Sequence, residues 1–146
     1  MASSAATPEF SLHPQLAQDT VAIGDLALSR LLIHKDANYA WLVLVPRCVG
    51  ITEIVDLDAN ARSQLMNEIA DVSQVLKDVT QCDKINVAAL GNLVPQLHVH
   101  VIARRKTDAA WPRPVWGAAP PIAYRDKYLQ ALIGTLRSKL GLDQTS

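Results

Sequence analysis

The 146-residue sequence lacks the features that define several large classes of protein. No apolar run reaches the ~20 residues needed to cross a bilayer. The first eight residues lack the basic and apolar regions of a secretory signal. Formal net charge is zero, so bulk charge predicts no nucleic acid partner. Internal repeats are absent too. We therefore expect a soluble protein that associates with neither a membrane nor a nucleic acid.

Cysteine is scarce, and its spacing excludes the usual cysteine-based sites. Cys48 and Cys82 are far apart and show no metal-type spacing, which favours a reduced, cytoplasmic setting. About half of the residues (49%) are hydrophobic, so a chain of this length can bury a substantial core. We expect a flexible leader over residues 1–9 and a single domain over residues 10–146.

Hydrophobic periodicity predicts an α+β fold, in which helices pack on an antiparallel β-sheet of about four to five strands. Two pairs of strands are each joined by a short turn, which favours two antiparallel hairpins. Asp56 or Asp58 is expected to cap the long helix. The expected elements are a helical turn within 10–18, strands over 19–23, 26–34, 41–45, 84–90 and 96–103, a long helix over 56–79 and a C-terminal helix over 122–141.

Residues 107–121 hold four of the eight prolines together with Trp111 and Trp116. This composition is incompatible with a regular helix or a central strand. Two interpretations stay open: a loop held on the core by its tryptophans, or a wall beside the strand that precedes it. The basic residues Arg104, Arg105 and Lys106 at the end of that strand are either a solvated strand end, the favoured interpretation, or an edge that faces phosphate.

The strand over 96–103 carries the most informative pattern. From Gln96 to Val101 polar and apolar residues alternate strictly, as expected when one face of a strand is buried. Side chains two residues apart leave the same face. Gln96, His98 and His100 therefore share one face, and the intervening apolar residues share the other, which faces a core.

Three interpretations of this histidine row remain open. It can be a polar face without chemistry. It can be part of a metal site, which would need His13 and His34 to converge on the pair, because zinc takes at least three protein ligands. It can also supply a nucleophile, because neutral imidazole attacks phosphorus near its pKa of ~6.5. In that case His98 is the central residue of the row.

Charge that develops on a phosphate in the transition state needs hydrogen-bond donors. Gln96 and His100 flank His98 on its own face, and Asn92 and Arg104 are further candidate donors. Trp111 and Trp116 are candidates to cover a leaving group. Three apolar residues are candidates for a nucleobase cleft between the first hairpin and the long helix, although ordinary core positions explain them better: Leu31, Ile33 and Leu44.

The run Gln-Leu-His-Val-His-Val-Ile from residue 96 to 102 resembles the signature of the histidine triad (HIT) family, three histidines that alternate with hydrophobic residues. The resemblance extends from about residue 10 to 117. Within the family, the chain is similar to the bacterial-type HIT-like hydrolases and transferases of nucleotides. Gln96 stands at the first histidine position. A glutamine amide still donates a hydrogen bond but does not titrate. The loop before the signature is shorter than in many members.

The resemblance implies a nucleotide-binding α+β fold, usually homodimeric, with the C-terminal helix as a candidate interface. It implies that His98 is the nucleophile that forms a covalent nucleotidyl-histidine at the α-phosphate, that His100 and Asn92 bind phosphate, and that position 96 supports the site. We expect the amide of Gln96 to bind phosphate as well. No metal or other cofactor is implied. The expected substrate is a nucleoside phosphoramidate, a dinucleoside polyphosphate or a nucleotide sugar. The alternatives are a non-catalytic nucleotide-binding or scaffold protein and a metal-binding module.

Overall fold

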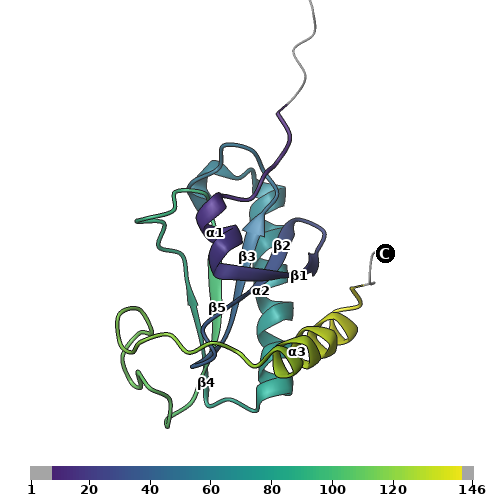
Figure 1. The fold of residues 1–146 in the computed structure, drawn as a ribbon. Coiled ribbons are helices and arrows are strands. Elements are labelled where there is room, and N and C mark those ends of the chain that lie inside the picture. Colours follow the sequence, from purple (N-terminus) through teal and green to yellow (C-terminus); the bar gives the residue numbers. More distant parts are fainter. Residues whose placement is uncertain (1–7, 143–146) are drawn as a thin grey trace, which may run out of the picture.

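A computed structural model describes residues 8–142, so most of the expected leader lies outside the described residues. Five strands form one antiparallel sheet with the order β1-β2-β3-β5-β4 (Figure 1). The α+β class and both expected hairpins are confirmed. The strands are β1 (Thr20–Asp25), β2 (Ser29–His34), β3 (Ala40–Pro46), β4 (Lys84–Ala88) and β5 (Val99–Arg104).

The helices are α1 (Pro14–Asp19), α2 (Ala59–Thr80) and α3 (Asp126–Lys139), with a short 3-10 helix η1 (Ile54–Asp56) before α2. Asp58 caps α2 by accepting a hydrogen bond of 2.8 Å from the Ala61 N–H. Asp56 lies in η1, so α2 begins later than the expected start at residue 56. None of the helices within residues 8–142 has the length and hydrophobicity needed to cross a bilayer.

The C-terminal helix is shorter than the expected range of 122–141. Ile122 is held in an extended conformation instead, because its carbonyl accepts a 2.7 Å hydrogen bond from the Ala37 N–H. Its own N–H donates to the Asp36 carboxylate at 3.2 Å, and Asp36 also forms a β-bridge with Ala123. These tertiary contacts with the turn between β2 and β3 override the helical pattern, so α3 begins at Asp126.

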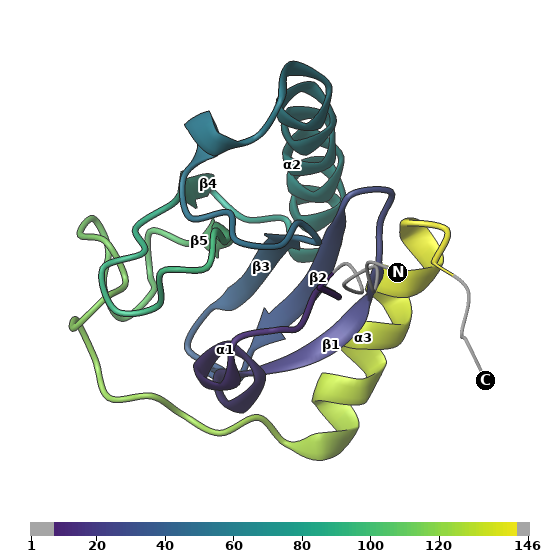
Figure 2. The ribbon, with the colours of Figure 1, turned by 90° about the horizontal axis from the view of Figure 1, so that it is seen from above.

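Helices lie on both sides of the sheet (Figure 2), and each face of the sheet carries its own hydrophobic cluster. The helices α2 and α3 cover the first face, where Leu97, Val99 and Val101 are buried as the alternating pattern predicts. The helix α1 and the loop after β5 cover the second face, through Leu16 and Val115. The two histidines of β5 and its approach lie toward this second face, beneath the loop and the N-terminal segment.

The strand that carries the histidines is shorter than expected. Pairing with β3 starts at Val99, opposite Leu44, and pairing with β4 starts at His100, opposite Ala88. Before Val99 the strand β4 has ended at Ala88, and the pairing with β3 does not continue past Leu44, although β3 itself runs to Pro46. The Leu97 N–H donates to the Ile51 carbonyl at 3.0 Å instead. His98 therefore lies directly before the first residue of β5, outside the hydrogen-bonded part of the sheet.

Candidate active site

His98 and His100 lie together and are 7% and 6% exposed. Their rings meet edge to face, with centroids 4.9 Å apart. The Nδ1 atom of His98 is 2.7 Å from the backbone carbonyl oxygen of Gln96. A carbonyl only accepts hydrogen bonds, so this contact assigns the proton to Nδ1. The lone pair of His98 is then on Nε2, the tautomer that a histidine nucleophile requires.

A hydrogen bond also fixes the tautomer of His100, but here the proton is on Nε2 instead of Nδ1. The indole N–H of Trp41 donates to His100 Nδ1 at 2.9 Å. An indole N–H only donates, so Nδ1 of His100 carries the lone pair and Nε2 carries the proton. Burial, together with the smaller effects of the neighbouring His98 and His34, lowers the pKa of His100 to about 3. His100 is therefore a neutral hydrogen-bond donor at physiological pH.

Trp41 was expected only as part of an apolar strand, and its polar role is a finding of the structure. It lies two residues before Val43, which pairs with His100, so the two side chains leave the same face of the sheet. Its ring also stacks on His34, with centroids 4.1 Å apart and 10° between the planes. The apolar run from Trp41 to Val45 predicts a buried strand but not a hydrogen bond from the indole N–H of Trp41. The sequence pattern therefore gave no indication of this contact.

The two tryptophans of the loop over 107–121 have different places. Trp116 lies against the site, with its ring centroid 5.0 Å from His100 and 5.6 Å from Trp41. It is 39% exposed, so part of its surface is open to a ligand. Trp111 packs beneath the Arg104 guanidinium, 5.6 Å from its ring centroid. Only Trp116 is brought to the histidine pair.

Arg104 is neither a solvated strand end nor a phosphate-facing donor, and both expectations for it were wrong. It is 1% exposed and donates to both carboxylate oxygens of Asp108, at 2.8 and 3.1 Å. Its remaining Nη1 donates to Asn86 at 2.8 Å. Burial by itself raises the pKa of Asp108, but Arg104 and the N–H groups of Arg105, Ala110 and Trp111 outweigh it and lower the pKa to about 2.

The side chain of Gln96 is directed to the N-terminal segment. Its Oε1 accepts from the His13 N–H and its Nε2 donates to the Ser11 carbonyl, both at 2.9 Å. Asn92, the other candidate phosphate ligand, is exposed on the loop between β4 and β5. It follows Gly91, one of the residues that border the cleft described next.

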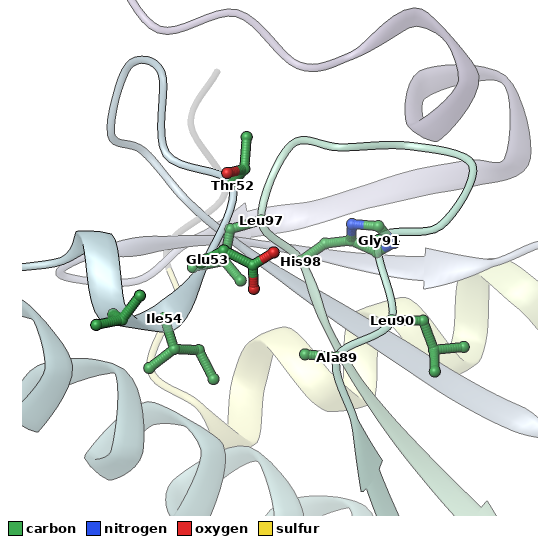
Figure 3. Close-up of a pocket in the computed structure, with 9 residues that line it drawn as sticks. Thr52, Glu53, Ile54, Ala89, Leu90, Gly91, Leu97 and His98 are labelled. Atoms are coloured by element: carbon green, nitrogen blue, oxygen red, sulfur yellow. The ribbon is translucent and has the colours of Figure 1, made fainter.

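A cleft of about 220 Å³ opens beside His98 (Figure 3). Two segments supply its walls: the chain from Thr52 to Val55, and Ala89, Leu90 and Gly91 after β4. Figure 3 shows the Glu53 side chain pointing from the first of these segments toward His98. Sequence patterns carried no signal for this segment, because the cleft forms only when it packs beside the loop after β4.

The apolar residues considered for a nucleobase cleft lie elsewhere. Leu31, Ile33 and Leu44 are 0% exposed and belong to the cluster beneath α2 and α3. No ligand can reach them without unfolding the sheet, so they are core residues.

The metal alternative gains no support within residues 8–142, where no group of three or more histidine, cysteine, aspartate or glutamate side chains is placed to hold an ion. His13 does not converge on the pair, because its Nδ1 accepts the Gln15 N–H at 3.0 Å and caps α1. His34 is engaged in the stack with Trp41.

Comparison with known proteins now identifies the class to which this fold and site belong. The model of the HIT domain matches residues 15–107, so the chain belongs to the HIT family. The HIT family belongs to a superfamily of nucleotide-binding proteins and hydrolases. The expected resemblance to this family is thereby confirmed.

Solved structures of histidine triad proteins match about nine-tenths of the chain. One from Bradyrhizobium japonicum is 59% identical, with a TM-score of 0.89, and the match covers 90% of this chain and 98% of that one. One from Marinobacter aquaeolei is 40% identical, with a TM-score of 0.89 and coverage of 92% and 98%. One from Sinorhizobium meliloti is 37% identical, with a TM-score of 0.87 and coverage of 89% and 96%. No protein of curated function matches the chain.

Proposed function

We propose that this protein cleaves nucleotides at the α-phosphate through a covalent nucleotidyl-His98 intermediate. The observation that carries the proposal is the 2.7 Å contact between His98 Nδ1 and the Gln96 carbonyl, which leaves a lone pair on Nε2. This atom belongs to a residue that borders an open cleft. A histidine with a fixed tautomer beside a cavity matches what nucleophilic catalysis requires.

The chemistry proceeds in two displacements. The lone pair of His98 Nε2 forms a bond to the α-phosphorus, and the bond from phosphorus to the leaving group breaks. The leaving group departs with that electron pair and takes a proton from solvent. The oxygen of a water molecule then forms a bond to the phosphorus and loses a proton to solvent. The bond from phosphorus to Nε2 breaks, its electron pair returns to Nε2, and a nucleoside monophosphate is released. His100, as a neutral N–H donor, stabilises the charge on the non-bridging oxygens.

The charges around the site favour a phosphoramidate over a dinucleoside polyphosphate. His100 is neutral, since burial lowers its pKa to about 3. Arg104 is buried and bound to Asp108 and Asn86. Glu53 is the one charged residue among those that border the cleft. A leaving group that carries several further phosphates would meet no compensating cation there, whereas an amine would meet a carboxylate. Trp116 is proposed to cover the leaving group.

The test measures release of AMP from adenosine 5′-phosphoramidate and from diadenosine tetraphosphate. We expect turnover of both, with a higher kcat/KM for the phosphoramidate. A radiolabelled adenylyl-protein should be trapped that survives base but not acid, and His98→Asn should form none and lose at least ~10³-fold in kcat. Undiminished turnover by a clean preparation of His98→Asn would exclude the nucleophile. Nucleotide binding without turnover by the unmodified protein would favour the non-catalytic alternative.

We further propose that the protein acts as a homodimer in the cytoplasm. β4 forms an open edge of the sheet, where Val87 is 49% exposed, and Tyr128 is 65% exposed on α3. Either surface offers apolar area to a second copy. Light scattering after size exclusion should give twice the mass of 15.9 kDa, and a mass of one chain would contradict the dimer.

A further inference from the structure

The amide of Gln96 joins two parts of the chain that are more than 80 residues apart. Both of its polar atoms bind the segment from Ser11 to His13, each through a 2.9 Å hydrogen bond to the backbone. This segment, which we call the N-terminal arm, is packed on the second face of the sheet through Leu12. It continues directly into α1, which anchors its C-terminal end.

The pairing suits a carboxamide and no other side chain. In an extended chain the carbonyl of one residue and the N–H of the second residue along point to the same side. Ser11 and His13 stand in this relation, and an amide presents one donor and one acceptor side by side to match them. The two ring nitrogens of an imidazole point in widely divergent directions, so a histidine satisfies only one of the two groups.

The same residue holds His98 by its backbone. The Gln96 carbonyl accepts the hydrogen bond from His98 Nδ1, and the next N–H, that of Leu97, donates to the Ile51 carbonyl at 3.0 Å. The peptide group between Gln96 and Leu97 is therefore held in two ways. Its N–H donates to Ile51, and the Gln96 side chain that precedes it is bound to the arm. Rotation of this group would take the carbonyl away from His98.

We propose that Gln96 is a positioning residue: by binding the N-terminal arm, its amide fixes the carbonyl that keeps the proton of His98 on Nδ1. This inference rests on the proposed function, in which Nε2 of His98 attacks phosphorus. It assigns to Gln96 a role that differs from phosphate binding, because both polar atoms of its amide are already used within the protein.

His13 offers a matched pair of variants. His13→Pro removes the N–H that donates to Gln96, and the φ of −54° at this position suits proline. His13→Ala keeps that N–H, and both variants lose the imidazole that caps α1. For His13→Pro we expect the Nδ1–H form of His98, read from ¹⁵N shifts of its ring, to lose its dominance. Its kcat should fall by about tenfold, as when a partner that fixes a ring tautomer is lost, with KM changed by less than about twofold.

Gln96→Glu tests the other hydrogen bond. A carboxylate still accepts from His13 but places an acceptor opposite the Ser11 carbonyl, so kcat should fall by about ten- to a hundredfold, together with the same change in ¹⁵N shifts. Gln130→Glu, an exposed position on α3, makes the same chemical change and should leave both readouts at the values of the unmodified protein.

Equal loss of kcat in His13→Ala and His13→Pro would assign the effect to the cap of α1 and overturn the proposal. Unchanged ring shifts of His98 in both His13→Pro and Gln96→Glu would overturn it as well. The ring shifts do not depend on any substrate. If the unmodified protein lacked phosphoramidase activity but the shifts responded as expected, the proposed function would fail and the positioning role of Gln96 would stand.

Discussion

The second face of the sheet holds two groups of polar side chains along β5 that use their hydrogen-bonding atoms in opposite ways. His98 and His100 each bind one neighbour through Nδ1, and Nε2 has no hydrogen-bond partner among the described residues. Four residues further along, Arg104 and Asp108 form an ion pair of 2.8 Å in which both groups are almost fully buried. Each histidine keeps one ring nitrogen open, whereas Arg104 and Asp108 are charged and bind each other through two hydrogen bonds.

This difference separates the work of the two pairs. Buried charges are tolerated when every donor and acceptor is matched, and the matched group then contributes to structure. A buried polar atom that lacks a partner and faces an opening remains available to a ligand. Removing the ion pair should therefore reduce stability, whereas changes around the histidines should reduce activity, and the following variants test that division.

The largest effect is expected at the ion pair. Asp108→Ala leaves the buried Arg104 guanidinium without its carboxylate and frees three backbone N–H groups, so the free energy of unfolding should fall by about 3–5 kcal/mol. Urea denaturation measures this change. The double variant Arg104→Met/Asp108→Leu should lose less than Asp108→Ala, because no charge remains unpaired. A greater loss in the double variant would contradict this account.

The next effect concerns pH. The pKa of His100 is about 3 in the folded protein, below the ~6.5 of an unfolded chain. Between these values the unfolded chain binds the extra proton, so stability should fall as pH decreases, by up to about 1.4 kcal/mol per pH unit. Denaturation curves of the protein and of His100→Asn should diverge from pH 6.5 downward. Parallel curves would show that His100 is not buried as a neutral ring.

A smaller effect is expected for Trp41→Phe, which removes the indole N–H that fixes the tautomer of His100. With the donor gone, Nε2 of His100 is no longer held as the protonated atom, and kcat/KM should fall by about tenfold. Trp111→Phe is the control, since Trp111 packs on Arg104 instead. An equal loss of activity in both variants would mean that any change of tryptophan disturbs the site.

The smallest effect is expected for Trp116→Ala. The ring covers one side of His100 but makes no hydrogen bond to it within the described residues. KM for the phosphoramidate should rise by about threefold, with kcat little changed, because the lost contact is equally present before and during reaction. The ratio of kcat/KM for two phosphoramidates whose amine leaving groups differ in size also tests whether Trp116 contacts the leaving group. A drop in kcat alone would show that Trp116 acts on the transition state.

Local patterns were sufficient to predict much of this structure. Alternation around His98 placed Leu97, Val99 and Val101 in a core, and periodicity located the long helix. Contacts between distant residues were beyond such patterns. The extended path of Ile122 depends on Asp36, and the ion pair of Arg104 depends on where the following loop folds back. Each is decided by a partner that only the folded chain brings near.

The link between Gln96 and the N-terminal arm also has a consequence for the order of events during synthesis. Ser11 and His13 leave the ribosome well before Gln96, which is 83 residues after His13. At typical rates of translation the arm waits roughly 4 to 17 seconds for its partner. A nascent chain that ends before Gln96 lacks the amide that binds the N-terminal arm, and it lacks His98 and His100. The surroundings of His98 therefore form only after residues 11–13 and residue 96 have both been synthesised.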